Sequence, residues 1–290
     1  SDRKVDVFTV KALFSTLTNV NFDSSRFAQL IKQAANMKEK TRKLYEDARK
    51  KAGRSAEVLS CPVNWWQGTG SIDELVRKGQ AVTIQNRLDE LGQDVTGLQE
   101  LITYGLKGAA AYVDHAQILG RQNNELYALF HQMLNYLSEG PAETNELLQK
   151  ALKCGEINLK AMALLDLANT DAYGSPEPTK VRITPIKGKS IVVSGHDLKD
   201  LEEILKQTEG KQINVYTHGE MLPCNAYPGL KKYKHLVGNY GGPWQHQRKE
   251  FEEFPGAILM TTNCLQKPKD SYRHRIFTSG LVGWPGIVHI

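Results

Sequence analysis

Three residues with metal-binding side chains, His196, Glu220 and Cys264, each follow a short apolar run in the second part of the sequence. They lie 24 and 44 residues apart along the chain. An imidazole nitrogen, a carboxylate oxygen and a thiolate sulfur are all established ligands of transition metals. The sequence therefore suggests a metal site, provided that the fold brings these three side chains together.

The apolar runs alternate with amphipathic stretches. The runs expected to form strands are 191–194, 213–216, 236–238 and 257–261. After the first of them, Asp197 is suited to cap a helix whose apolar residues recur every three or four positions. Strands that alternate with helices predict parallel βαβ units, whose ligands bind beyond the carboxyl ends of the strands. We therefore expect the three candidate ligands to share one rim of the sheet.

The first part of the chain has a different pattern. Residues 1 to about 173 carry helical spacing with short connections, which favours an antiparallel bundle. The helical pattern ends in the segment 173–178, which holds a glycine and two prolines. We expect an α + α/β protein with an N-terminal helical bundle (1–175) and a parallel-sheet, Rossmann-like α/β domain (176–290). Residues 181–183 are expected to be the first strand of that second domain.

Composition narrows the possible partners. The formal net charge is +5, and the whole excess follows Ser175, where 16 Lys and Arg face 11 Asp and Glu. No basic stripe is interleaved with aromatic residues, so we expect no nucleic-acid partner. No apolar run approaches the ~20 residues that span a bilayer. We expect no membrane partner, and the sequence from Ser1 lacks the apolar core of a signal peptide, which predicts a cytoplasmic protein.

The four cysteines, at positions 61, 154, 224 and 264, form no CxxC pair. Their spacing argues against a disulfide framework, a self-contained zinc knuckle and the usual four-cysteine iron–sulfur motif. Three of them are expected to be small buried residues. Cys264 differs because of its place after a predicted strand.

Several longer segments resemble the hybrid-cluster protein (prismane, hydroxylamine reductase) family. They are Ser194–Leu201, Asn214–Pro223, Val237–Gly242, Thr261–Cys264, Ala12–Phe22 and Tyr104–Tyr112. The resemblance covers nearly the whole chain. It implies a hybrid iron–sulfur–oxygen cluster, with His196, Glu220 and Cys264 in the positions of the family's His, Glu and first cluster Cys. The catalytic residues stay unknown.

The resemblance also implies an activity and partners. It implies an oxidoreductase that reduces small nitrogen–oxygen substrates, hydroxylamine to ammonia or nitric oxide to nitrous oxide, with electrons from a separate reductase. Family members carry a cysteine-rich segment for a second, cubane-type cluster before the position of Ser1, and a third domain after Ile290. This chain is therefore expected to be a partial chain, inactive alone, whose partners include the remaining domains.

Other interpretations stay open. Taken singly, His196 and Glu220 could be ordinary residues near helix starts, and Cys264 a small buried residue. His218 could support a metal ligand or only a loop, and the turn at 239–242 could cradle a ligand or only connect two elements. The alternative for the chain as a whole is a cluster-free fragment or degenerate homologue that acts as a scaffold. A nucleotide-binding domain is less favoured because no GxGxxG follows the first strand.

Overall fold

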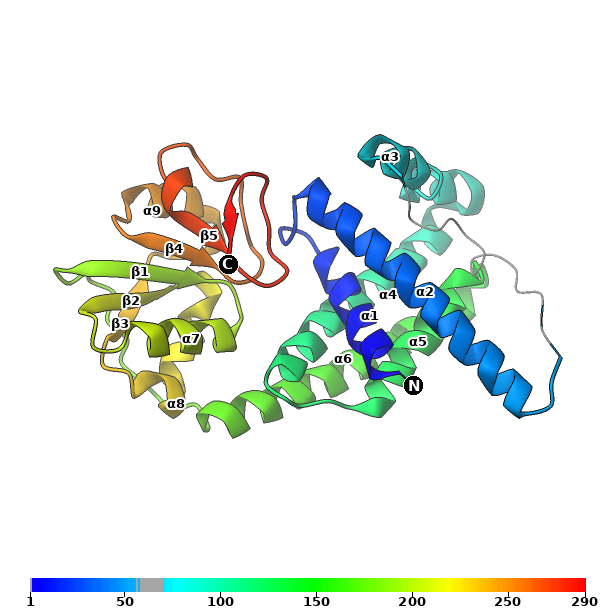
Figure 1. Cartoon of the computed structure of the whole chain (residues 1–290), viewed down its shortest axis with the longest axis horizontal. Helices are drawn as coiled ribbons and strands as arrows, with labels where there is room; N and C mark the ends of the chain where they lie inside the picture. The colour runs from blue at the N-terminus through cyan, green and yellow to red at the C-terminus, as the bar shows by residue number, and fades with distance from the viewer. Residues whose placement is uncertain (1, 56, 58–69) are drawn as a thin grey trace. The chain divides into compact units, whose positions relative to one another are not determined.

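The computed structural model describes residues 2–55, 57 and 70–290 (Figure 1). Cys61, Trp65 and Trp66 lie outside the described residues. The chain forms two compact units, of which the first comprises residues 1–13, 24–110 and 123–160, and the second comprises residues 14–23, 111–122 and 161–290. The helices α4 and α6 contribute residues to both units. The sequence places a boundary at residue 175 between two domains that each fold independently. That boundary stays a prediction.

Six long or medium helices precede the sheet. They are α1 (Arg3–Ser15), α2 (Ser24–Lys51), α3 (Ile72–Gln80), α4 (Ile84–Ile118), α5 (Asn124–Ser138) and α6 (Thr144–Tyr173). Gly92 interrupts α4 with a non-helical backbone. Asn123 caps α5 because its side chain accepts the backbone N–H of Leu126.

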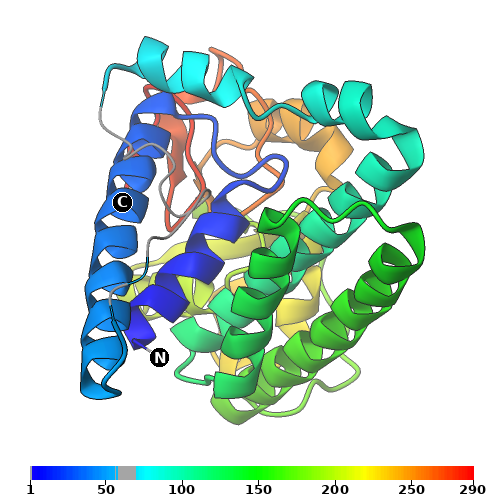
Figure 2. The ribbon, with the colours of Figure 1, turned by 90° about the vertical axis from the view of Figure 1, so that its right-hand side faces the viewer.

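The first unit is a helical assembly with an apolar interior. Its fully buried side chains include Ile102 and Leu106 on α4, four residues apart on one face of the helix. Leu126 and Phe130 repeat this spacing on α5. Helix α1 runs beside α2 (Figure 2), and side chains of both line one hollow. The helices of this unit lie within the part of the chain whose periodicity predicts helices.

The second unit is built on a six-stranded, entirely parallel sheet in the order β3-β2-β1-β4-β5-β6. The strands are β1 (Lys189–Ser194), β2 (Ile213–His218), β3 (Leu236–Tyr240), β4 (Ala257–Met260), β5 (Ile276–Thr278) and β6 (Val288–His289). The connecting helices are α7 (Leu198–Thr208), the 3-10 helix η1 (Gly219–Ala226), α8 (Pro228–Lys231), the 3-10 helix η2 (Trp244–His246) and α9 (Gln247–Glu253). A further 3-10 turn, η3 (Arg273–Arg275), precedes β5. The order reverses at β1, which has β2 on one side and β4 on the other.

Alternate residues of the strands pack on opposite faces of this sheet. Val193 and Val215 belong to one apolar cluster, which includes Leu201 of α7. Val192 and Ile258 belong to another, which includes Phe251 of α9. Because successive strand residues point to opposite faces, two apolar residues in a row each find a core of their own. This explains why the strands read as continuous apolar runs.

The expected α + α/β fold class is confirmed: most of the described residues up to Tyr173 are helical, and a parallel sheet with helices around it follows. The expected strand at 181–183 is wrong. This segment has no strand structure, and its backbone meets the sheet where the Asn239 N–H donates to the Arg182 carbonyl at 2.9 Å. Prolines at 176, 178 and 185 flank it and restrict regular pairing.

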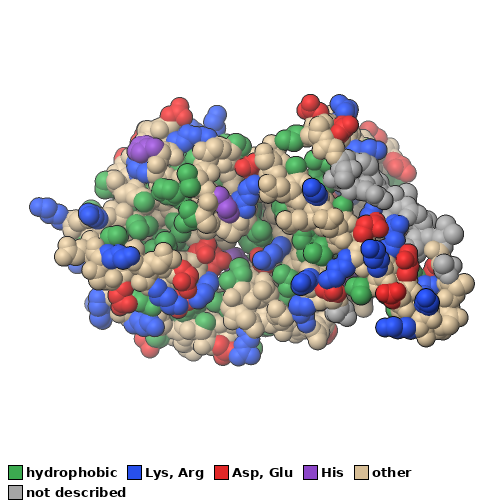
Figure 3. Space-filling view, viewed as in Figure 1, with side chains coloured by type: hydrophobic (Ala, Val, Ile, Leu, Met, Phe, Trp, Pro, Cys, Tyr) green, Lys and Arg blue, Asp and Glu red, His purple; other side chains and the backbone are tan. Residues whose placement is uncertain are grey.

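The surface agrees with the composition. On the face shown in Figure 3, acidic and basic side chains are interspersed over the described residues. None of the helices in the described part of the chain combines the length and the apolar character needed to cross a bilayer.

Gly256, just before β4, offers a test of how closely β4 approaches β1. A Cβ at this position would lie 2.0 Å from the Ser190 carbonyl oxygen, which is far inside van der Waals contact. We expect Gly256→Ala to lower the free energy of unfolding by about 1–3 kcal/mol or more, because the two backbones must separate. Urea denaturation followed by circular dichroism measures this. Gly155→Ala, on a helix with open space around the added methyl group, is the control and should not destabilise. An unchanged midpoint for Gly256→Ala would contradict the described pairing of β1 with β4.

Candidate metal centre

His196 is placed by a tight turn directly after β1. Gly195 has a φ of +116°, and a Cβ there would lie 2.4 Å from Thr261 Oγ1 and 2.6 Å from the Thr262 nitrogen. Only glycine allows the turns after β1 and β4 to approach so closely. Asp197 then caps α7 by accepting the backbone N–H groups of Lys199 and Asp200, as the sequence predicts. The imidazole of His196 is therefore held between a strand end and a capped helix.

Both ring nitrogens of His196 have partners. Nδ1 lies 3.0 Å from Thr262 Oγ1 and 3.1 Å from the carbonyl oxygen of Asn263. Nε2 contacts the Glu220 carboxylate. A histidine whose Nδ1 faces a backbone carbonyl has its ring orientation fixed, and this is how metal-binding histidines are commonly supported. The ring is thus positioned to present Nε2 to whatever lies beside Glu220.

The three candidate ligands line one hollow at the carboxyl end of the sheet, at the point where the strand order reverses. The hollow, of about 230 Å³ including its solvent-open part, also has Trp244 and Gln247 on its wall. Glu220, in the first turn of η1, is the most exposed of the three, with 60% of its side chain accessible. Cys264 is half-buried, and burial followed by the charge of Glu220 raises the pKa of its thiol. The structure therefore brings together the residues that the sequence singled out.

Gln247 fixes the backbone around Cys264. Its amide nitrogen donates to the Cys264 carbonyl at 2.8 Å, and its amide oxygen accepts the N–H of Gln266 at 3.0 Å. The side chain is buried, so both bonds form away from water, where a lost partner costs about 1–3 kcal/mol. On the next residue, the N–H of Leu265 donates to the Asn19 carbonyl at 2.9 Å. The backbone is therefore anchored at Cys264 and at the two residues that follow it.

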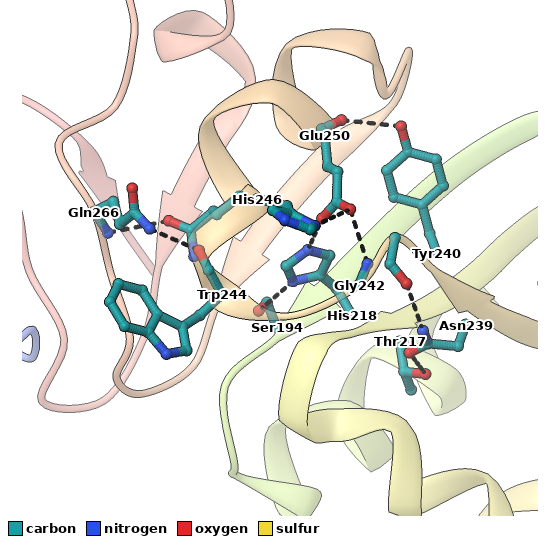
Figure 4. A network of polar contacts seen from close by, with 12 residues as sticks. Ser194, Thr217, His218, Asn239, Tyr240, Gly242, Trp244, His246, Glu250 and Gln266 are labelled. Atoms are coloured by element: carbon teal, nitrogen blue, oxygen red, sulfur yellow. Dashed lines mark hydrogen bonds and ion pairs between the residues drawn. The ribbon is translucent and has the colours of Figure 1, made fainter.

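A second imidazole, that of His218, also lines the hollow, but it is held in a buried polar network (Figure 4). Its Nδ1 lies 3.0 Å from Ser194 Oγ, and its Nε2 lies 2.9 Å from Glu250 Oε2. Burial lowers the pKa of His218, against the opposing effect of the Glu250 charge. Sequence reasoning singled out His218 but missed Ser194 and Glu250. Nothing in the sequence around His218 indicates that Glu250 is its partner, because Glu250 lies 32 residues further along the chain on α9.

The three candidate ligands do not form a closed ligand set. Across residues 2–55, 57 and 70–290, no group of three or more His, Cys, Asp and Glu side chains is arranged to hold a metal ion. His196 and Glu220 touch each other, while Cys264 faces the same hollow without joining their contact. A site with nitrogen, oxygen and sulfur donors suits a transition metal such as iron, whereas a site with oxygen donors alone suits magnesium, calcium or manganese.

Comparison with known proteins adds the family. The family model described as the Prismane/CO dehydrogenase family matches residues 1–290. The chain belongs to the Prismane/CO dehydrogenase family. Curated members similar to it include the hydroxylamine reductase of Acidithiobacillus ferrooxidans, 51% identical over 290 residues, and that of Syntrophobacter fumaroxidans, 50% identical over 290 residues. The hydroxylamine reductase of Burkholderia lata is 47% identical over 289 residues.

These prismane-family relatives are longer than the chain. Each of the three matches covers the whole of this chain but 52% of the relative. The chain thus spans about half the length of the curated relatives it matches. Two of its cysteines outside the hollow, Cys154 and Cys224, are buried, as the sequence predicts.

Asp200, in the first turn of α7, is a second carboxylate close to the helix cap behind His196. Its Oδ2 accepts the hydroxyl of Ser279 at 2.6 Å. Burial, followed by the charge of Asp197, raises the pKa of Asp200 to about 6. The folded chain therefore holds a proton on this carboxyl at a pH where the unfolded chain has released it.

This shift predicts a pH dependence of stability. A carboxyl whose pKa is raised by folding stabilises the folded state fully at a pH below its unfolded pKa. For Asp200 this stabilisation is lost as the pH rises from about 4, the unfolded pKa, to about 6, the folded pKa. Asp200→Asn should remove this loss and raise the free energy of unfolding at pH 7 by about 1–2 kcal/mol, after allowance for solvent screening. Urea denaturation at pH 4 and pH 7 measures it, with Asp270→Asn at an exposed position as the control. A gain that is equal at both pH values would contradict the raised pKa.

Proposed function

We propose that the chain contributes His196, Glu220 and Cys264 to a hybrid iron–sulfur–oxygen centre of a prismane-family oxidoreductase. Its substrates are small nitrogen–oxygen compounds, with hydroxylamine reduced to ammonia as the leading reaction and nitric oxide reduced to nitrous oxide as the other. The observation that supports this most is that an imidazole, a carboxylate and a thiol from three separate strand ends line one hollow. Relatives about half identical over the whole chain are named hydroxylamine reductases.

The donor set fits such a centre chemically. Sulfur and nitrogen ligands suit iron, and a carboxylate suits an iron that also carries oxygen ligands. The supports of the donors fit as well, because His196 is oriented through its Nδ1 and the Cys264 backbone is held by Gln247. Among the described residues we propose three donors at this hollow, and further ligands of a multi-iron cluster are proposed to come from the rest of the full-length protein.

The contact between His196 and Glu220 is compatible with metal binding. Both side chains are partly exposed, with accessible fractions of 35% and 60%. Ion pairs at such exposure contribute about 0–1 kcal/mol. The Glu220 carboxylate can therefore turn from His196 Nε2 toward a metal at small cost, which would free the ring nitrogen as well.

The proposed reaction needs electrons from outside the chain. Two electrons and two protons convert hydroxylamine to ammonia and water, with cleavage of the nitrogen–oxygen bond. Bound iron would supply electron transfer and a coordination position for the substrate. The chain itself orients the donors, and Trp244 and Gln247 contribute to the wall of the hollow that they face. An electron-donating reductase is proposed as the partner.

A second candidate function is that of a cluster-free scaffold. It is favoured by one observation: the described residues contain no group of three acidic, His or Cys side chains arranged as a metal site. In this case His196 and Glu220 form only a structural contact. The two candidates differ in what they predict for the iron content of the protein.

The proposal predicts a specific loss in Cys264→Ala. In protein expressed from its complete gene and prepared anaerobically, this variant should contain less iron and show an altered electron paramagnetic resonance spectrum. Hydroxylamine turnover should fall by at least about 10- to 100-fold, the loss typical when even an outer partner of a ligand is removed. Cys154→Ala is the matched control, because it removes a thiol that is buried between helices and away from the hollow.

The outcomes separate the two candidates. Iron in the unaltered protein that is lost in Cys264→Ala and kept in Cys154→Ala would support the metal centre. Iron-free protein with no reductase activity would favour the scaffold. Equal iron content in both variants would show that Cys264 is not a ligand.

A further inference from the structure

We propose that Glu250 is a positioning residue for the candidate metal centre: its carboxylate holds His218 and the turn at Gly241–Gly242, and thereby fixes the chain that carries Glu220. This inference rests on the proposed function and deepens it. It also resolves the role of His218, which the sequence left open, by assigning it to support and not to metal binding.

The first step is the orientation of His218. A carboxylate oxygen can only accept a hydrogen bond, so the proton of the contact with Glu250 Oε2 lies on His218 Nε2. The Ser194 hydroxyl can then donate to Nδ1, at 3.0 Å. The ring also packs against Phe251, with centroids 4.8 Å apart. Both nitrogens are thus engaged within the protein, and only one orientation of the ring satisfies them.

The second step is the use of both oxygens of Glu250. While Oε2 accepts from His218, Oε1 accepts the backbone N–H of Gly242 at 2.8 Å (Figure 4). The main-chain carbonyl of Glu250 in turn accepts the hydroxyl of Tyr240 at 3.0 Å. One residue of α9 therefore connects the end of β2 with the end of β3 and the turn after it.

The third step is how closely this turn packs. Gly241 has a φ of +75°, and a Cβ there would lie 2.5 Å from Glu250 Oε2 and 3.0 Å from His218 Cδ2. The turn thus fits directly over the contact between the carboxylate and the imidazole. No side chain at Gly241 could be accommodated without displacing one of them. The sequence left open whether the turn at 239–242 only connects two elements. We infer that it also packs over the contact between Glu250 and His218 and keeps the two side chains in place.

The fourth step links the network to Glu220. Pairing of β2 with both of its neighbours ends at His218, opposite Ser194 on β1 and Tyr240 on β3. The next residue, Gly219, has a φ of +59°, and Glu220 follows at once. His218 is therefore the last paired residue of β2, and its side chain is held directly before the left-handed Gly219 and the exposed Glu220. When the imidazole of His218 is held in place, the backbone that leads into Glu220 starts from a fixed position beside the hollow.

The test compares substitutions of one carboxylate. Glu250→Ala leaves the Nε2–H of His218 and the N–H of Gly242 without their acceptor. Glu250→Gln can keep the network in reversed polarity: its amide oxygen accepts from Gly242, and its amide nitrogen donates to Nε2. The proton of His218 then moves to Nδ1, which donates to Ser194. Glu253→Ala, on the exposed side of the same helix, is the matched control.

Two measurements are made on protein from the complete gene. Iron content and the electron paramagnetic resonance spectrum are recorded after anaerobic preparation. Separately, nitrogen NMR of protein labelled at histidine and prepared without iron reports the ring protonation of His218 and the environment of His196. We expect Glu250→Ala to weaken iron binding about 10- to 100-fold, while Glu250→Gln retains it with His218 in the other tautomer. We also expect Glu250→Ala to shift the His196 signals, and Glu253→Ala to change neither measurement.

Wild-type iron content and spectra in Glu250→Ala, with or without a lower melting temperature, would overturn the proposal, because the residue would then serve stability alone. So would unshifted His196 signals in that variant. If the unaltered protein binds no iron, the proposed function fails, and the NMR comparison alone then decides whether Glu250 positions the His196–Glu220 pair.

Discussion

The parallel pairing of β1 with β2 on one side and β4 on the other is the constraint on which the candidate site depends. Parallel strands end at the same edge of a sheet, so residues that follow three different strands are brought to one rim whatever their separation in sequence. In this chain the three strands are adjacent, and the order reverses at the middle one. The chain that follows β1 therefore leads toward β2, and the chain that follows β4 leads toward β5 on the other side. The hollow lies between these two diverging connections. Gly195 permits the close approach of the two turns at this point.

The parts that the sequence predicts are those set by local pattern. Apolar runs at 191–194, 213–216 and 257–261 become strands because each is buried on both faces, and the cap at Asp197 depends on neighbouring residues only. The segment 181–183 has the residue types of a strand but lies among prolines and stays irregular. The short strands β5 and β6 were not expected, since two or three residues carry no readable periodicity.

The same reasoning separates the candidate ligands from their supports. His196, Glu220 and Cys264 can be found because their side chains can bind metals and each follows an apolar run that is predicted to be a strand. Glu250 and Gln247 cannot be found in this way. Each lies on α9, and each acts on a loop that is distant in sequence and reached only after the sheet has formed. Among helical Glu and Gln residues, nothing local distinguishes the one that is buried from its exposed neighbours.

The chain carries two contacts between an imidazole and a carboxylate at this rim, and their surroundings give them different roles. The side chains of His218 and Glu250 are 1% and 16% accessible, whereas those of His196 and Glu220 are 35% and 60% accessible. Removing the partner of a buried hydrogen-bonded group costs about 1–3 kcal/mol, and more for a charged group, while an exposed pair contributes about 0–1 kcal/mol. Displacing Glu220 from His196 therefore costs less than displacing Glu250 from His218. This difference in burial supports the proposal that His196 binds metal while His218 belongs to the framework that holds the site in place.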